Sequence, residues 1–236
     1  EIIEPKSDIE AIDTELIIAD LETLEKRKTK LQKTAKSGDK DAKLQVDFIE
    51  RITETLDNSR PARAVEIQND TEKKLLKEYN LLTSIPVLFV CNIQDPSEAN
   101  NNLAQTVKEF AEAEKIPVVL LAGKLESEIM DIDDLEERKT FMKEMGLNEP
   151  GLNCMIKTGY DLLNLVTFFT VGGAENRAWT IRQNSRAPQA AGTIHSDFER
   201  GFIRAAVYNF DDLVKYKNEN AVKEAGKLRL EGKDYI

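Results

Sequence analysis

The residues best suited to bind a small molecule are Asn92 and Asp95, in the string Asn92-Ile93-Gln94-Asp95. A side-chain amide both donates and accepts hydrogen bonds, so an Asn at the carboxyl end of a strand can bond the edge of a purine base. An Asp three residues later could accept from the ring N–H and amino groups of guanine. Asn and Asp are also common turn residues. A purine pocket and a plain turn therefore both stay open for this string.

A second candidate segment is Ala122-Gly123-Lys124, which we predict to be a loop. It follows an apolar run, as Asn92 does, and its backbone N–H groups could face the same base. If both runs are neighbouring parallel strands, their carboxyl ends lie at one edge of a sheet, where ligands of open α/β sheets bind. This second loop strengthens the case for the base pocket, and the pocket and the plain turn both stay open.

The elements that would position these residues alternate between strand and helix. The runs Ile85-Pro86-Val87-Leu88-Phe89-Val90-Cys91 and 116–121 are apolar throughout, which predicts strands covered on both faces. Apolar positions at helical spacing predict helices over 103–114, 132–145 and 151–164. Strand, helix and strand in this order indicate an α/β domain with a parallel sheet. Two strands do not form a stable parallel sheet alone, so we expect further strands from sequence outside these 236 residues.

No motif that binds phosphate is present. The three Gly-Lys pairs, at 123–124, 226–227 and 232–233, lack the glycine five positions earlier that a G-x-x-x-x-G-K-[ST] loop requires. A nucleophile elbow and a zinc-protease signature are absent too. The single histidine, His195, is expected to be structural rather than catalytic. The two cysteines, Cys91 and Cys154, are expected to be buried free thiols, with a disulfide or a metal pair as the alternative.

Residues 14–57 predict two antiparallel helices. Ile17, Leu21 and Leu24 begin one narrow apolar stripe, and Ile49 and Ile52 lie in the other. Two such stripes facing each other form a coiled-coil hairpin. Its tip, residues 26–43, carries eight basic and two acidic residues. These charges are compatible with contact to a phosphate backbone, but also with a solvated surface. The candidates for nucleic-acid contact on the hairpin are Lys26, Lys28, Lys30, Lys33 and Lys36.

The composition changes near residue 164. Two strands over 165–170 and 177–181, around a turn at Gly172-Gly173, predict a β-hairpin. A helix near 189–199, a strand near 202–208, a helix near 219–226 and a strand near 227–231 follow, which indicates a small α+β domain. Arg177 and Arg182 are further candidates for nucleic-acid contact, and Trp179 is expected in the core rather than as a stacking platform.

The overall composition is that of a globular protein. Hydrophobic residues make up 41% and charged residues 32% of the chain, and no apolar stretch is long enough to span a membrane. The net charge of −10 is uneven, with 22 basic against 34 acidic residues in 1–163 and 11 against 9 in 164–236. The first residue is Glu1 rather than Met, so we expect a trimmed sequence. The two expected free thiols indicate a reducing compartment, the cytoplasm.

Several long strings resemble the YchF/Obg-like ATPase family, and the resemblance covers essentially the whole chain. It is carried by residues 187–205 (APQAAGTIHSDFERGFIRA), 177–181 (RAWTI), 223–235 (KEAGKLRLEGKDY) and 20–27 (DLETLEKR). The resemblance implies an α/β fold in three parts. Residues 1–13 and 61–163 correspond to the second half of a Ras-like P-loop NTPase domain, 14–60 to an inserted coiled-coil hairpin, and 164–236 to a TGS domain of the β-grasp type.

The family resemblance also implies a function. The family generally uses ATP, with Mg²⁺ in the intact protein, and its base motif typically is N-x-x-E. Asn92 matches this motif, Asp95 stands where Glu is usual, and Ile93 stands where GTPases carry Lys. Ala122-Gly123-Lys124 stands where related NTPases show Ser-Ala-Lys. The family's P-loop, switch regions and metal ligands match nothing here, so catalytic residues are expected before Glu1 and these residues alone should be inactive.

The resemblance thus predicts a cytoplasmic ATPase, with ATP preferred over GTP, that regulates by associating with the ribosome or RNA. We expect a monomer that needs no zinc and no membrane. The alternative is a non-catalytic adaptor that contacts RNA or the ribosome through the basic coiled coil and the TGS domain. A P-loop upstream of Glu1 would favour the ATPase, and its absence would leave the adaptor.

Overall fold

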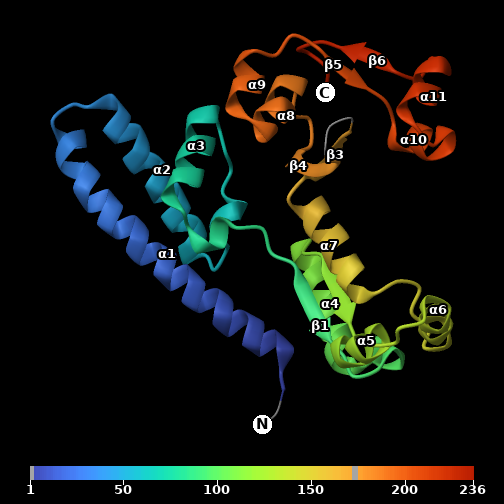
Figure 1. Cartoon of the computed structure of the whole chain (residues 1–236). Helices are drawn as coiled ribbons and strands as arrows, with labels where there is room; N and C mark the ends of the chain where they lie inside the picture. Colours follow the sequence, from blue (N-terminus) through green and yellow to red (C-terminus); the bar gives the residue numbers. More distant parts are fainter. Residues whose placement is uncertain (1–2, 172–174) are drawn as a thin grey trace. The chain divides into compact units, whose positions relative to one another are not determined.

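The chain folds into two compact units in a computed structural model, which describes residues 3–171 and 175–236 (Figure 1). The first unit ends at Leu162 and the second runs from Leu163 to Ile236. No helix within the described residues is long and apolar enough to cross a membrane. The two thiols, Cys91 and Cys154, are free, and both are half-buried rather than buried as expected.

A long helical hairpin opens the first unit (Figure 1). Helix α1 spans Pro5–Lys36 and α2 spans Lys40–Asp57, so α1 begins nine residues before the predicted start at 14. Pro5 in the first turn has a fixed φ that suits a helix start, which sequence periodicity alone did not reveal. At the tip, Gly38 has a φ of 96° and Asp39 caps α2 by accepting from the Ala42 backbone N–H.

The predicted apolar stripes are confirmed, and they form the main core of the first unit together with residues up to 81. Leu24, Phe48, Ile49, Ile52 and Leu56 are almost completely buried. The third side of this core comes from segments that the sequence analysis assigned to the nucleotide domain. These are the 3₁₀ turns η1 (Ala62–Ala64) and η2 (Leu82–Ser84) and helix α3 (Asp70–Tyr79), which contribute Ala62, Val65, Leu75, Tyr79 and Leu81.

A buried carboxylate joins α1 to η2. Asp20 is 2% exposed and accepts from the backbone N–H groups of Leu82 and Thr83, at 2.7 and 2.8 Å, and from the Thr83 hydroxyl at 2.7 Å. The Thr83 hydroxyl in turn accepts from the Ala62 N–H at 2.8 Å. Every donor that faces this carboxylate is satisfied, which is the condition for burying a charge inside a fold.

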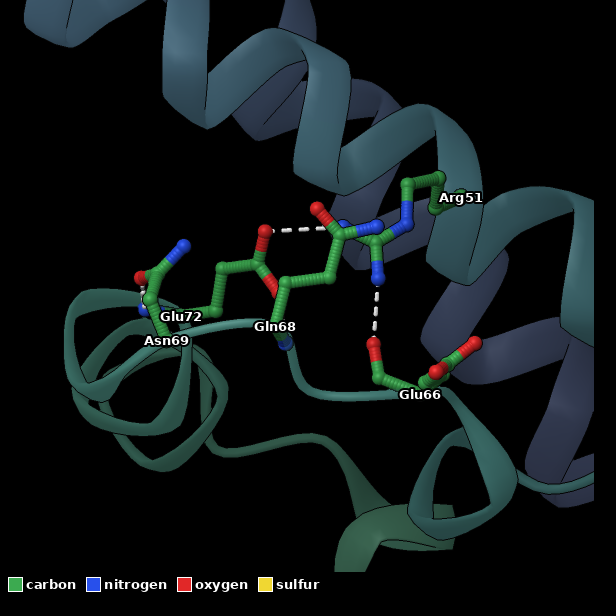
Figure 2. A network of polar contacts seen from close by, with 5 residues as sticks. All are labelled: Arg51, Glu66, Gln68, Asn69 and Glu72. Carbon is green, nitrogen blue, oxygen red and sulfur yellow. Dashed lines mark hydrogen bonds and ion pairs between the residues drawn. The ribbon is translucent and has the colours of Figure 1, made fainter.

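A second polar network joins α2 to α3 (Figure 2). Arg51 pairs with Glu72 at 2.7 Å and also donates to the backbone carbonyl of Glu66. The other Glu72 oxygen accepts from the Gln68 N–H at 2.9 Å, and the Asn69 side chain caps α3 by accepting from the Glu72 N–H. One carboxylate thus holds the entry to α3 against the hairpin.

The rest of the first unit is built around two parallel strands. Strand β1 (Phe89–Asn92) pairs with β2 (Val118–Leu121), so that Asn92 lies opposite Leu121. Helix α4 lies between them in sequence, and its bounds match the predicted helix closely. The helices of this part are α4 (Asn102–Glu114), α5 (Gly123–Met130), α6 (Leu135–Glu144) and α7 (Gly151–Leu162), with a 3₁₀ turn η3 (Pro96–Asn100) after β1.

Three predictions about this part were wrong. The strand predicted over 85–91 begins only at Phe89, because Pro86 has no N–H to donate and the 3₁₀ turn η2 ends just before Ile85. The strand is not covered on both faces, since Val90 is 42% exposed. The predicted loop Ala122-Gly123-Lys124 is instead the cap and first turn of α5, a helix that the sequence analysis missed along with α3.

The second unit contains two antiparallel strand pairs and four helices within its described residues. The strands are β3 (Leu165–Thr170), β4 (Arg177–Arg182), β5 (Ala205–Val207) and β6 (Arg229–Glu231), paired β3–β4 and β5–β6. The helices are α8 (Ala187–Ile194), α9 (Ser196–Arg200), α10 (Phe210–Tyr216) and α11 (Glu219–Glu224).

The predicted β-hairpin is confirmed, although its Gly172-Gly173 turn lies outside the described residues. The single helix predicted over 189–199 is two helices, because His195 leaves the helical conformation with φ −161° and ψ 139°. Helix α10 was not predicted. Trp179 is half-buried, not a core residue: its Nε1 donates to the Thr170 hydroxyl, and the Arg177 guanidinium lies 4.4 Å from its ring centre.

Candidate functional site

The carboxyl ends of β1 and β2 bring Asn92 and Gly123 into contact. The parallel register ends with Asn92 beside Leu121, and the Ile93 N–H donates to the Leu121 carbonyl at 2.9 Å. The chain after each strand therefore leaves the sheet at the same edge. There the Gly123 N–H donates to the Asn92 Oδ1 at 3.3 Å. Asn92 is exposed, so its Nδ2 group can still donate to a ligand.

Gly123 fits this contact because it has no side chain. A Cβ placed on Gly123 would lie 3.3 Å from the Asn92 Oδ1, closer than most Cβ contacts allow. Lys124 follows in the first turn of α5 and is exposed. The first N–H groups of a helix have no partner within the helix, so the N–H of Lys124, the residue after Gly123, needs an acceptor outside α5. The first turn of α5 also carries the partial positive charge of a helix amino end.

Asp95 is placed three residues after Asn92 at the start of η3. Its Oδ1 accepts from the backbone N–H of Ser97 at 2.8 Å and from the Ser97 hydroxyl at 2.5 Å. These two hydrogen bonds hold the pKa of Asp95 below its usual value of 3.8, and the bond from the Ser97 hydroxyl has the larger effect. Asp95 is therefore ionised at neutral pH, but one of its oxygens is committed to capping the turn. The turn predicted for this string is therefore present at Asp95, whereas the purine pocket at Asn92 stays a prediction.

A hydrogen bond to the Glu126 side chain holds Ala122 in place. Ala122 is 2% exposed, and its N–H donates to Glu126 Oε1 at 3.2 Å. Glu126 is itself 8% exposed, and its other oxygen accepts from the N–H of Gly151 at the start of α7. The sequence analysis missed Glu126. A local signal existed in an acidic residue five positions after the end of β2, but its partner Gly151 is 25 residues away.

A cavity of about 900 Å³ lies at the opposite ends of the two strands. Pro86, Val87, Ile116 and Pro117 line it, and all four precede β1 or β2. Ligands of open α/β sheets bind at the carboxyl ends of strands, where Asn92 lies. We therefore place the candidate site at the Asn92 edge and not in this cavity.

The five hairpin lysines fall into two groups. Lys26 lies 3.6 Å from Glu22 on its own helix, and Lys28 lies 3.0 Å from Glu50 across the hairpin, with its side chain only 23% exposed. Lys30, Lys33 and Lys36 are exposed, and no ion pair within 3–171 and 175–236 involves them. The three lysines nearest the tip are therefore available to bind an external anion, whereas Lys28 pairs the two helices of the hairpin.

The two arginines predicted to contact nucleic acid, Arg177 and Arg182, do not share a surface. Arg177 and Arg182 are both exposed on β4, but they are five residues apart, so their side chains leave opposite faces of the strand. Arg177 covers the Trp179 ring, as described above. His195 caps α9, since its Nδ1 accepts from the Asp197 N–H at 3.2 Å, which agrees with the structural role expected for it. No cluster of three or more potential metal ligands occurs within the residues that the structure describes.

Comparisons with known proteins identify similar sequences over the whole chain. A family model described as YchF-GTPase_C, Protein of unknown function (DUF933), matches residues 165–236. The Ribosome-binding ATPase YchF of Haemophilus ducreyi is 47% identical over 234 residues, which cover 99% of this chain and 64% of that protein. The Bacillus subtilis protein of the same name is 45% identical over 239 residues, with the same two coverages.

A solved structure gives the same result for the fold. The Schizosaccharomyces pombe YchF GTPase superposes with a TM-score of 0.85 at 30% identity, over 100% of this chain and 66% of that one. The chain belongs to the YchF family. It spans 64% of the length of the curated relatives it matches. The α/β fold class expected from the sequence, part of a YchF chain with a helical hairpin and a parallel strand pair, is confirmed.

For this YchF chain, the sequence predicted the polar residues at the ends of the strands but not the residues that hold them in place. Asn92, Asp95 and Gly123 could be named because they follow apolar runs. Glu126, Ser97 and Gly151 hold that edge through hydrogen bonds and close packing, and single-sequence patterns do not reveal such contacts.

Proposed function

We propose that this chain supplies the base-binding half of a purine-nucleotide hydrolase that works in association with the ribosome. The observation that carries the proposal is the contact between Asn92 and Gly123 at the carboxyl edge of β1 and β2. The Asn92 amide, the N–H of Lys124 and the Asp95 carboxylate can meet donors and acceptors on the edge of a purine. The relatives named Ribosome-binding ATPase YchF support both the chemistry and the setting.

ATP is the proposed substrate in preference to GTP. Guanine recognition needs a carboxylate that accepts from both the ring N–H and the amino group. In Asp95, Ser97 already occupies Oδ1 with two hydrogen bonds, which leaves less acceptor capacity for guanine. Ile93, at the position where GTPases carry Lys, offers no polar group for the base.

Phosphate binding and Mg²⁺ coordination belong to the other part of the proposed active site. Residues 1–236 contain no G-x-x-x-x-G-K-[ST] loop, so the base edge alone has no means to position a triphosphate for hydrolysis. We therefore propose that hydrolysis requires the family's phosphate-binding segment in the same polypeptide. Residues 1–236 by themselves should release no phosphate from ATP or GTP above background. The intact protein is proposed to be a cytoplasmic monomer that needs no zinc.

The direct test is a calorimetric titration of a full-length YchF protein carrying this sequence. Asn92→Ala should weaken ATP binding by about 1–3 kcal/mol, because polar groups on the base lose their partner in the site. A matched control is Asn100→Ala, an exposed asparagine at the end of η3. The parent should bind ATP more tightly than GTP. Equal ATP affinity for the parent and Asn92→Ala would remove Asn92 from the site.

The free lysines near the hairpin tip support a second function, contact with a phosphate backbone as an RNA or ribosome adaptor. Replacing Lys30, Lys33 and Lys36 by Glu should lower binding to ribosomes or RNA and flatten its salt dependence, because fewer counterions are released. The chain should stay folded, since these positions are exposed. Lys6→Glu, an exposed lysine at the far end of α1, is the control. Filter binding across a salt series measures both, and an unchanged slope in the folded triple variant would contradict the contact.

A further inference from the structure

Glu126 is the one buried carboxylate next to the base edge within the described residues, and it accepts from two separate segments. Its Oε1 bonds the Ala122 N–H at 3.2 Å, and its Oε2 bonds the Gly151 N–H. Ala122 is the cap residue of α5, and Glu126 reaches back from the helix to the N–H of this cap residue, much as the Glu of a capping box does. Gly151 is the first residue of α7, so the carboxylate lies at two helix amino ends, where negative charge is favoured.

The close packing around Glu126 leaves it little freedom to move. A Cβ on Gly151 would lie 2.5 Å from Leu121 Cδ1 and 2.7 Å from Glu126 Oε1. Gly151 therefore brings the α7 backbone against both the end of β2 and the carboxylate. The position of Ala122, and of the two residues that follow it, is thus set by a contact to α7 and not by β2 alone.

We infer that Glu126 is a positioning residue of the base site: it aims the N–H groups of Gly123 and Lys124 at Asn92 and at the purine edge. The inference rests on the proposed purine-binding function. Glu126 need not touch the nucleotide, since it acts through Ala122. A carboxylate suits this role because both of its oxygens accept, whereas the amide of a Gln would turn one N–H toward another N–H.

The test uses a full-length YchF protein with this sequence, the variant Glu126→Gln and the control Glu128→Gln. Glu128 lies on the same helix and is exposed. Glu126→Gln should raise the dissociation constant for ATP about tenfold, the equivalent of roughly one hydrogen bond. Binding of inorganic tripolyphosphate, which has no base, should not change. In steady-state hydrolysis the KM for ATP should rise while kcat stays near the parent value.

A second pair of variants tests the same contact from α7. Gly151→Ala should weaken ATP binding as Glu126→Gln does, because its methyl group displaces the carboxylate. Gly159→Ala lies on the same helix, where an added Cβ meets nothing within 4 Å, and should bind ATP like the parent. Amide hydrogen exchange at Ala122 should accelerate in Glu126→Gln and in Gly151→Ala, and in neither control.

The outcomes separate the two proposals. If the parent binds ATP and Asn92→Ala weakens it, the purine site stands. Unchanged ATP affinity in both Glu126→Gln and Gly151→Ala would then overturn the positioning role alone. An equal loss of ATP and tripolyphosphate binding in Glu126→Gln would also overturn it, because the effect would be general and not confined to the base. A parent without purine affinity would remove the proposed function, and the inference with it.

Discussion

Asp20 and Asp95 show how differently the two polar regions of the first unit use a carboxylate. Asp20 is buried and accepts three hydrogen bonds from residues more than 60 positions away in sequence. Asp95 is only part-covered and accepts from a single residue two positions away. The first carboxylate joins distant segments of the fold, and the second shapes a local turn at an open edge.

The surroundings of the two carboxylates differ in the same way. We define the base of the hairpin as the core residues between Ile17 and Leu81 together with Asp20, Arg51 and Glu72. The charged groups of these three residues are paired with protein partners. The strand edge, which we define as Asn92, Asp95 and 122–124, leaves the Asn92 Nδ2 and the Lys124 side chain exposed. Polar groups that are satisfied internally stabilise the fold, while unsatisfied exposed ones are available to a ligand.

The largest expected effect is that of Asp20→Ala on stability. The substitution leaves the N–H groups of Leu82 and Thr83 and the Thr83 hydroxyl without their acceptor, and each buried donor costs about 1–3 kcal/mol. We expect the free energy of unfolding of the helical region to fall by about 4 kcal/mol. Far-ultraviolet circular dichroism in a denaturant series measures it.

Two internal controls sharpen that experiment. The only tryptophan, Trp179, lies in the second unit, so its fluorescence should report an unchanged transition there. Asp95→Ala should change stability far less than Asp20→Ala, because Ser97 can bond water instead. Equal losses in the two variants would show that the strand edge is as much a structural anchor as the base of the hairpin.

The next effect in size is expected for Glu72→Ala, which opens the network of Figure 2. Arg51 and the Gln68 N–H both lose their carboxylate partner, and the Glu72 side chain is 6% exposed. Arg51 is partly exposed and keeps its bond to the Glu66 carbonyl, so we expect a loss of about 2 kcal/mol rather than the full cost of a broken buried pair. Denaturant unfolding measures it.

The matched control is Glu136→Ala, which breaks an exposed pair with Lys139 at 2.8 Å. Surface pairs contribute about 0–1 kcal/mol, so this variant should unfold almost like the parent. If both variants lose the same free energy of unfolding, burial does not explain the contribution of the Arg51–Glu72 pair to stability.

The same contrast explains how much the sequence could predict. The hairpin stripes and the residues after each strand were found because periodicity and apolar runs are local signals. Helix α3 was missed because, in Asp70–Tyr79, only Leu75, Leu76 and Tyr79 are apolar, too few to show a helical period. Asn69 with Glu72 three residues later is a helix-start signal that the prediction did not use, whereas the packing of Tyr79 on Phe48 becomes visible only in three dimensions.

The strand edge was predicted in part for a similar reason. Gly123 and Lys124 suggested a loop because a glycine after a strand is common in turns, yet they begin α5 because Glu126 satisfies the Ala122 N–H. Contacts over long sequence separations, such as Glu126 with Gly151 and Asp20 with Thr83, leave no pattern in one sequence. The residues that support a site are therefore harder to predict than those that face it.

The smallest expected effect concerns Tyr79, the exception to complete pairing at the base of the hairpin. Its ring centre lies 6.2 Å from that of Phe48 and 4.5 Å from the Arg27 guanidinium, but its buried hydroxyl has no hydrogen-bond partner among the described residues. Tyr79→Phe removes this unsatisfied group and keeps the ring, so we expect a gain of up to about 1 kcal/mol. Phe48→Leu, which disturbs the ring contact, should destabilise instead.

The pH dependence of the Tyr79→Phe difference tests whether burial of the hydroxyl is the cause. Burial raises the pKa of Tyr79 to about 12, although Arg27 acts in the opposite direction. The usual pKa of a tyrosine hydroxyl is 10, so between pH 10 and pH 12 the unfolded chain loses the hydroxyl proton of Tyr79 while the folded chain keeps it. The titration of Tyr79 therefore leaves the free energy of unfolding unchanged below pH 10 and lowers it as the pH rises toward 12. The advantage of Tyr79→Phe should grow over that range. Paired unfolding curves and tyrosinate absorbance measure it. A difference between the two proteins that stays constant up to pH 12 would mean that the hydroxyl reaches water, and that the base of the hairpin is as open at this point as the strand edge.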